Sequence, residues 1–122
     1  MKLCGHEIGI EHPLFLIAGP DTLESQQLAI DVAGHIAPIA KKLGILYIFK
    51  DPYDKANRSS GESFRGIGME LGLQILADVR EATGLPVLTV VHEPDQCAPT
   101  AEVVDVLQIP AFLCRPTDLL LA

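Results

Sequence analysis

The sequence predicts an α/β fold in which parallel strands alternate with helices, and two observations support this prediction. Short apolar runs that suit buried strands recur along the chain, at residues 14–18, 46–49, 87–91 and 103–107. Segments with helical spacing of apolar residues separate these runs. Elements in this order form right-handed βαβ units and a parallel sheet. The 122 residues are therefore expected to form a single domain, 1–122, in which a lead-in of residues 1–13 precedes about four βα units in 14–122.

The first unit begins with the apolar run 14–18, which predicts a strand buried on both faces. Asp21 and Glu24 have the spacing of a capping box, so Asp21 is expected to cap the helix that follows. That helix is expected to end at Gly44. Pro38 lies inside it and should kink the helix or cost ~3 kcal/mol.

The cycle then repeats. A strand at 46–49 is followed by a polar loop at 50–66 and by a helix that is expected to end at Gly84. The later elements are a strand at 87–91, a short helical turn from Asp95 to Ala101 that Pro99 breaks, and a strand at 103–107. The final residues, Leu119 to Ala122, suggest the start of another helix, so the chain is expected to be cut short of a finished fold.

The overall charge of the chain disfavours nucleic acid as a partner, because the formal net charge is -7. The basic residues are nevertheless concentrated. Four of the nine lie within sixteen positions, namely Lys50, Lys55, Arg58 and Arg65. The sequence therefore predicts a local anion-binding site on an acidic protein.

The three cysteines, Cys4, Cys97 and Cys114, are odd in number and have no C-x-x-C spacing, which is typical of reduced thiols in a cytosolic protein. Cys97 and Cys114 are expected to be buried as small apolar side chains, and a structural zinc site is not expected. The N-terminus lacks the apolar segment of a signal peptide, and no apolar run approaches ~20 residues. A cytoplasmic protein without a membrane partner is the expectation.

The polar segment from Lys50 to Ser60 directly follows an apolar strand. Ammonium and guanidinium groups supply charge for a bound phosphate or carboxylate, and amide and hydroxyl groups supply direction. Ligands of parallel sheets bind at the carboxyl ends of the strands, where this segment is predicted to lie.

From Leu14 onward the sequence resembles the 3-deoxy-D-manno-octulosonate 8-phosphate synthase family. The blocks that carry the resemblance are Phe15-Leu16-Ile17-Ala18-Gly19-Pro20, Asp54-Lys55-Ala56-Asn57-Arg58-Ser59-Ser60, Ser63-Phe64-Arg65-Gly66, His92-Glu93-Pro94 and Asp105-Val106-Leu107-Gln108-Ile109-Pro110. The resemblance implies a (β/α)₈ TIM barrel, of which this chain would be the N-terminal half. It also implies a homo-oligomeric transferase that condenses phosphoenolpyruvate with arabinose 5-phosphate and releases phosphate, in the synthesis of the KDO sugar of lipopolysaccharide.

The resemblance also implies roles for particular residues, although it assigns no catalytic residue. Lys50 and Lys55 would contact phosphoenolpyruvate, and Gln108 would approach its phosphate. The arabinose 5-phosphate would be held by Asn57, Arg58 and Ser59. Arg115 matches an arginine that reaches a sugar phosphate across a subunit interface.

Several residues depart from the family pattern. Asp21 occupies a position that is a cysteine metal ligand in some members and an asparagine in others; because the other ligands belong to the second half, no metal and no other cofactor are expected. Pro52 replaces a serine beside the phosphoenolpyruvate site, and Val90 replaces an aspartate that faces the substrates. The remaining departures are Asp51 for a small neutral residue, Gly61-Glu62 for Ile-His, and Pro116 for a glutamine.

Other interpretations of the same residues stay open. Lys55 and Arg58 could instead form solvated salt bridges with acidic residues of their own loop, Asp51, Asp54 and Glu62. His92 could be a hydrogen-bonded structural residue, and Gln108 could pair with loop backbone. A second function is therefore possible, a catalytically silent half-barrel that keeps an anion site or acts as an interaction module. In either case the unpaired first and fourth strands predict self-association.

Overall fold

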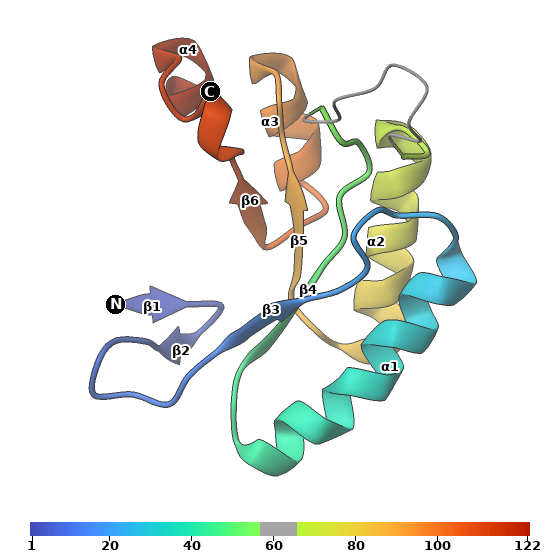
Figure 1. Cartoon of the computed structure of the whole chain (residues 1–122), viewed down its shortest axis with the longest axis vertical. Coiled ribbons are helices and arrows are strands. Elements are labelled where there is room, and N and C mark those ends of the chain that lie inside the picture. The colour runs from blue at the N-terminus through green and yellow to red at the C-terminus, as the bar shows by residue number, and fades with distance from the viewer. Residues whose placement is uncertain (57–65) are drawn as a thin grey trace.

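The computed structural model describes residues 1–56 and 66–122. Its centre is a parallel sheet with the strand order β3-β4-β5-β6 (Figure 1). The strands are β3 (Leu16–Ala18), β4 (Tyr47–Lys50), β5 (Val87–Val90) and β6 (Val106–Gln108). Three helices follow successive strands: α1 (Gln26–Leu43), α2 (Met69–Thr83) and α3 (Pro94–Ala101). This arrangement confirms the predicted α/β class and is consistent with part of a TIM barrel.

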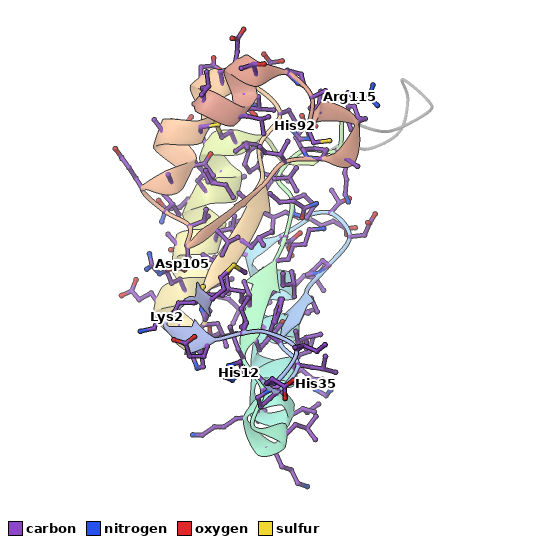
Figure 2. The ribbon with its side chains drawn as sticks, turned by 90° about the vertical axis from the view of Figure 1, so that its left-hand side faces the viewer. Lys2, His12, His35, His92, Asp105 and Arg115 are labelled. Carbon is purple, nitrogen blue, oxygen red and sulfur yellow. The ribbon has the colours of Figure 1, made fainter. Side chains whose placement is uncertain are left out.

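The four strands of the sheet are parallel, so their carboxyl ends lie together at one end of the sheet. Lys50 of β4 pairs with Leu88 of β5, and Val90 of β5 pairs with Gln108 of β6. A short 3₁₀ turn, η1 (Ala111–Leu113), and the helix α4 (Thr117–Leu121) follow β6 at the same end. Figure 2 shows His92 and Arg115 near this end and Lys2 and Asp105 farther toward the other.

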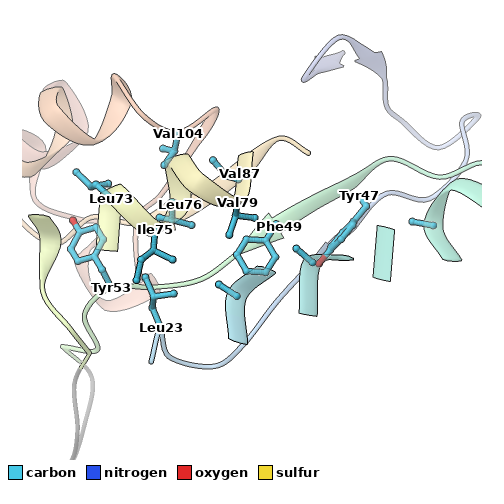
Figure 3. Packing of buried hydrophobic residues seen from close by; sticks show 13 residues of the cluster. Leu23, Tyr47, Phe49, Tyr53, Leu73, Ile75, Leu76, Val79, Val87 and Val104 are labelled. Atoms are coloured by element: carbon cyan, nitrogen blue, oxygen red, sulfur yellow. The ribbon is translucent and has the colours of Figure 1, made fainter. Parts of the chain in front are cut away.

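The core lies between the sheet and the helices α1 and α2, which pack against each other (Figure 3). Its fully buried members include Phe49 of β4, Leu76 and Val79 of α2, and Val87 of β5. Burying each such side chain contributes about 1.5–3 kcal/mol relative to leaving it in water. The core therefore fixes β4 and β5, whose carboxyl ends carry the residues considered below.

The first strand differs from its prediction. Only Leu16–Ala18 pairs in the sheet, and Leu14 and Phe15 are 84% and 40% exposed. The strand was expected to be buried on both faces, but β3 is an edge of the sheet, and one of its faces stays open in the described part of the chain.

The prediction that Asp21 caps the first helix is wrong. The helix α1 begins at Gln26, and its N-cap is Ser25, whose hydroxyl oxygen accepts the backbone N–H of Leu28 at 3.2 Å. The chain is first held against the loop after β4, because the backbone N–H of Leu23 donates to the carbonyl of Pro52 at 3.1 Å. This contact delays the helix and leaves Asp21 in the connecting turn. Pro38 lies inside α1, as predicted, and the helix continues on both sides of it. The kink or energetic cost expected there stays a prediction.

The segment around α3 also differs from its prediction. Residues 94–101 form one continuous helix, although Pro99 was expected to break it. The predicted strand at 103–107 begins only at Val106, because the N–H groups of Val103 and Val104 both donate to the carbonyl of Thr100 at 3.0 Å. These two β-branched residues therefore close the helix instead of joining the sheet.

Two smaller differences concern the cysteines and the lead-in. Cys97 is buried as predicted, but Cys114 is exposed, and its thiol donates to the carbonyl of Ala111 at 2.9 Å. The lead-in forms an unpredicted antiparallel pair, β1 (Lys2–Leu3) with β2 (His6–Glu7). No helix in the described part of the chain combines the length and apolarity needed to cross a membrane.

Candidate functional site

A pocket of about 70 Å³ lies at the carboxyl ends of β4, β5 and β6. Its lining includes polar groups from three separate stretches of the chain. The described residues that line it are Lys50, Pro52, Asp54, Lys55, Val90, His92, Gln108, Pro110 and Phe112. The volume is below the ~300–1,000 Å³ typical of complete small-molecule sites, so these residues enclose one part of such a site.

Lys50 is the last residue of β4, and its side chain is brought to the pocket by the strand itself. Burial lowers the pKa of Lys50, and the positive charge of Lys55 lowers it further. The carboxylates of Asp21 and Asp51 act in the opposite direction on the same pKa. Two lysines thus share one partly desolvated region, which favours binding of an anion between them.

Lys55 reaches the pocket from the loop that follows β4. Its ammonium nitrogen lies 3.0 Å from a carboxylate oxygen of Asp21, and the side chain of Lys55 is only 18% exposed. The interpretation of Lys55 as a solvated loop residue is therefore wrong for its side chain. One acidic partner of Lys55 is Asp21, which comes from the turn after β3 and not from the loop itself. Glu62 lies outside the described residues.

Asp51 lies between these lysines in the sequence but is fully buried and is absent from the pocket lining. Neither of its carboxylate oxygens has a hydrogen-bond partner among the described residues. Burial raises the pKa of Asp51 to about 8, although the charges of Lys55 and Lys50 oppose the rise. Burial therefore favours the uncharged form of Asp51, which adds less negative charge beside the anion site than an exposed aspartate would.

Gln108 and His92 enter the pocket from β6 and from the end of β5. The backbone carbonyl of Gln108 accepts the N–H of Val91 at 3.0 Å, which extends the pairing of the two strands. The interpretation that the side chain of Gln108 pairs with loop backbone stays a prediction. The backbone N–H of His92 donates to the side-chain oxygen of Gln96 at 2.8 Å. This bond holds the backbone of His92 at the wall of the pocket. A structural role for its imidazole stays a prediction.

The structure brings together three of the predicted substrate-binding residues, Lys50, Lys55 and Gln108. Asn57, Arg58 and Ser59 lie outside the described residues, as do Gly61 and Glu62. Arg115 is exposed, lies between η1 and α4, and does not line the pocket (Figure 2). Its predicted role requires a neighbouring subunit and stays a prediction.

Sequence reasoning missed His92, Pro110 and Phe112 as pocket residues. Each follows a strand by a few positions, so the rule that ligands bind at carboxyl ends could have indicated them. Pro52 and Val90, which the resemblance placed beside the substrates, do line the pocket.

The described residues contain no group of three or more His, Cys, Asp or Glu side chains that could hold a metal ion. Asp21, at the position where the resemblance implies a variable ligand, is engaged with Lys55. The expectation that the protein uses no metal stays a prediction.

Comparisons with known proteins point to one family. Residues 4–122 match the family model described as DAHP synthetase I family. The chain is 61% identical over all its 122 residues to a protein of Bordetella petrii named 2-dehydro-3-deoxyphosphooctonate aldolase, and covers 43% of it. It is 60% identical over the same length to the proteins of that name from Cupriavidus taiwanensis and Cupriavidus necator, covering 42% of each. The chain thus spans less than half the length of these curated relatives.

Proposed function

Because the chain belongs to the DAHP synthetase I family, we propose that its pocket is the phosphoenolpyruvate-binding part of an enzyme of the 3-deoxy-8-phosphooctulonate synthase type. Such an enzyme would be a transferase that joins phosphoenolpyruvate to arabinose 5-phosphate and releases phosphate, in the synthesis of lipopolysaccharide KDO. The name of the relatives, 2-dehydro-3-deoxyphosphooctonate aldolase, agrees with an aldol-type reaction that gives an eight-carbon phosphorylated oxo acid.

One observation carries this proposal: Lys50, Lys55 and Gln108, from two strands and one loop, line the same pocket. Phosphoenolpyruvate carries a phosphate and a carboxylate, and two ammonium groups in a partly desolvated pocket offset that charge. A glutamine amide can add a directed hydrogen bond to either group.

The proposed reaction forms one carbon–carbon bond and one carbon–oxygen bond, the latter to water, and breaks the carbon–oxygen bond to the phosphate. The C3 atom of the enol attacks the aldehyde carbon of arabinose 5-phosphate, and the aldehyde oxygen takes up a proton. Water adds at C2, and inorganic phosphate leaves with the bridging oxygen. Positive charge develops at C2 while the leaving phosphate becomes more negative, so fixed ammonium groups near the phosphate stabilise the transition state more than the substrate.

Calorimetric titration with phosphoenolpyruvate, followed by arabinose 5-phosphate and a phosphate-release assay, tests the proposal. Lys50→Ala and Lys55→Ala should each weaken phosphoenolpyruvate binding by about 10- to 100-fold, as expected for the loss of a charged hydrogen-bonding partner. Lys42→Ala is the matched control, because Lys42 lies in the last turn of α1 away from the pocket. Equal binding by all three variants would contradict the proposal.

A second function, a catalytically silent half-barrel that binds anions or serves as an interaction module, is favoured by the identity of two lining residues. Pro52 has no side-chain donor and Val90 has no polar group, yet both line the pocket. Binding of phosphoenolpyruvate without phosphate release would support the silent function. Phosphate release that requires both substrates would support the enzymatic function.

The proposal also includes the other expectations drawn from the sequence, which stay predictions. They are a homo-oligomeric state, a reaction without a cofactor, small-molecule substrates with no nucleic-acid partner, and a cytoplasmic location. The role of Asn57, Arg58 and Ser59 at the sugar phosphate belongs to them too.

A further inference from the structure

An ion pair joins two different loops at the candidate site. Asp21 follows β3 and Lys55 follows β4, and their charged groups lie 3.0 Å apart. The two partners differ in exposure: the side chain of Lys55 is 18% exposed and that of Asp21 is 78% exposed. The ammonium therefore belongs to the pocket wall, and the carboxylate lies on its solvent side.

Backbone contacts on both sides of Asp21 hold this carboxylate near the pocket. Gly19 lies against the carbonyl of Lys50 so closely that any side chain there would overlap the carbonyl oxygen. On the other side, the N–H of Leu23 donates to the carbonyl of Pro52 at 3.1 Å. The turn that carries Asp21 is thus fixed against the strand end that carries Lys50.

The carboxylate of Asp21 takes part in the charge balance of the two lysines. Lys50 and Lys55 are close enough for the charge of Lys55 to lower the pKa of Lys50, whereas Asp21 raises it. Without a bound anion, two neighbouring ammonium groups repel each other, and a nearby carboxylate reduces that repulsion. A bound phosphate would supply the same negative charge.

We propose that Asp21 is an internal counterion of Lys55, which an incoming phosphorylated anion displaces, so that Asp21 lowers the anion affinity of the pocket. This inference rests on the proposed function for the identity of the anion. The side chain of Asp21 is 78% exposed, so its carboxylate has room to turn toward water, while the side chain of Lys55, 18% exposed, stays at the wall. Exposed ion pairs are weak, so the counterion weakens anion binding without preventing it.

The test compares Asp21→Asn with the unchanged chain. Titration with phosphoenolpyruvate, and separately with inorganic phosphate, should give a Kd about two- to fivefold lower for Asp21→Asn, the range that an exposed ion pair allows. Asp31→Asn is the matched control, because Asp31 is an exposed carboxylate on α1 that accepts a hydrogen bond from Gln27. It removes the same charge away from the pocket and should leave the Kd unchanged.

A double-mutant cycle separates the counterion role from a general charge effect. In a Lys55→Ala background the gain from Asp21→Asn should largely disappear, because the pair no longer exists. An equal gain in both backgrounds, a gain matched by Asp31→Asn, or weaker binding by Asp21→Asn would overturn the inference.

The outcomes also distinguish this inference from the proposed function. Equal binding of phosphoenolpyruvate by Asp21→Asn and the unchanged chain would overturn the counterion role alone. Tighter binding of inorganic phosphate by Asp21→Asn, with no binding of phosphoenolpyruvate by either protein, would overturn the proposed function and keep the counterion role. Absence of any anion binding in both proteins would overturn both.

Discussion

Gly19 lies directly against the backbone carbonyl of Lys50, so the turn after β3 and the end of β4 are in van der Waals contact. This contact sets where the turn can pass and therefore where the carboxylate of Asp21 meets Lys55. Only glycine therefore fits at position 19, and both the sheet and the candidate site depend on it.

Gly19→Ala should destabilise the protein by about 1–3 kcal/mol, because the added methyl group overlaps backbone that cannot move without distorting β4. Urea unfolding monitored by circular dichroism measures the change. Gly34→Ala is the control: position 34 lies inside α1, a Cβ there meets nothing within 4 Å, and the change should stabilise the protein by about 0.5–1 kcal/mol. Similar losses from both substitutions would show that the contact with Lys50 is unimportant.

The buried carboxyl of Asp51 should make stability depend on pH. Its pKa in the folded chain is about 8, against an ordinary value of 3.8, so the folded state keeps a proton that the unfolded state loses. Below about pH 4 Asp51 is protonated in both states and does not lower the free energy of unfolding. As the pH rises from there toward about 8, the free energy of unfolding falls by at most about 1.4 kcal/mol per pH unit.

Asp51→Asn cannot ionise and should remove that loss, so the variant should be the more stable protein at pH 7 to 8. Urea unfolding at several pH values between 4 and 9 measures the slope in both proteins. Asp31→Asn changes an exposed carboxylate and should keep the original slope. A slope that survives in Asp51→Asn would locate the titrating group elsewhere.

Asp105 joins the end of α2 to the start of β5, at the opposite end of the sheet from the pocket. One of its carboxylate oxygens accepts from Arg80 at 2.8 Å, and the other accepts the backbone N–H of Val87 at 2.9 Å. Asp105→Ala leaves that N–H without its acceptor and should cost about 1–3 kcal/mol. Asp105→Asn keeps an acceptor oxygen and should cost less. Equal losses in thermal or urea unfolding would show that the bond to Val87 contributes little.

The open edges of the sheet predict self-association. β3 and β6 are the outer strands, and Ile17 and Leu107 on them are 40% and 37% exposed. Unpaired apolar edges favour pairing with another chain. Sedimentation at micromolar concentration should therefore give a mass above the 13.1 kDa of one chain.

Lysine at both edge positions, in the double variant Ile17→Lys and Leu107→Lys, should raise the monomer fraction, because edge charges oppose strand pairing. Leu43→Lys is the control, since Leu43 is 67% exposed at the end of α1 and not on the sheet. A monodisperse monomer of the unchanged chain would contradict the prediction.

The sequence predicted the elements whose signals are local. The helix that ends at Gly84 and the strand that begins at Val87 were found because apolar spacing, glycine and β-branched residues agree there. The start of α1 was missed, because a backbone bond between Leu23 and Pro52, far apart in sequence, keeps the turn out of the helix until Ser25.

The candidate site was predictable to a similar extent. Lys50 was expected at the carboxyl end of its strand, the resemblance placed Gln108 at the same substrate, and both line the pocket. The partner of Lys55 was not predictable, since the carboxylate of Asp21 approaches it from another unit of the fold. The burial of Asp51 was missed for a related reason: the sequence shows a charged residue but not the layer that covers it.

Residues 50–54, at the end of β4 and just after it, alternate between the pocket and the protein interior. Lys50, Pro52 and Asp54 line the pocket, whereas Tyr53 packs in the core and Asp51 is fully buried. Adding or deleting one residue here would exchange the two sets, placing an ammonium in the apolar layer and a tyrosine at the anion. The length of this stretch is therefore a constraint on the fold: a substitution at Lys50 changes binding alone, whereas an insertion or deletion disturbs the core and the pocket together.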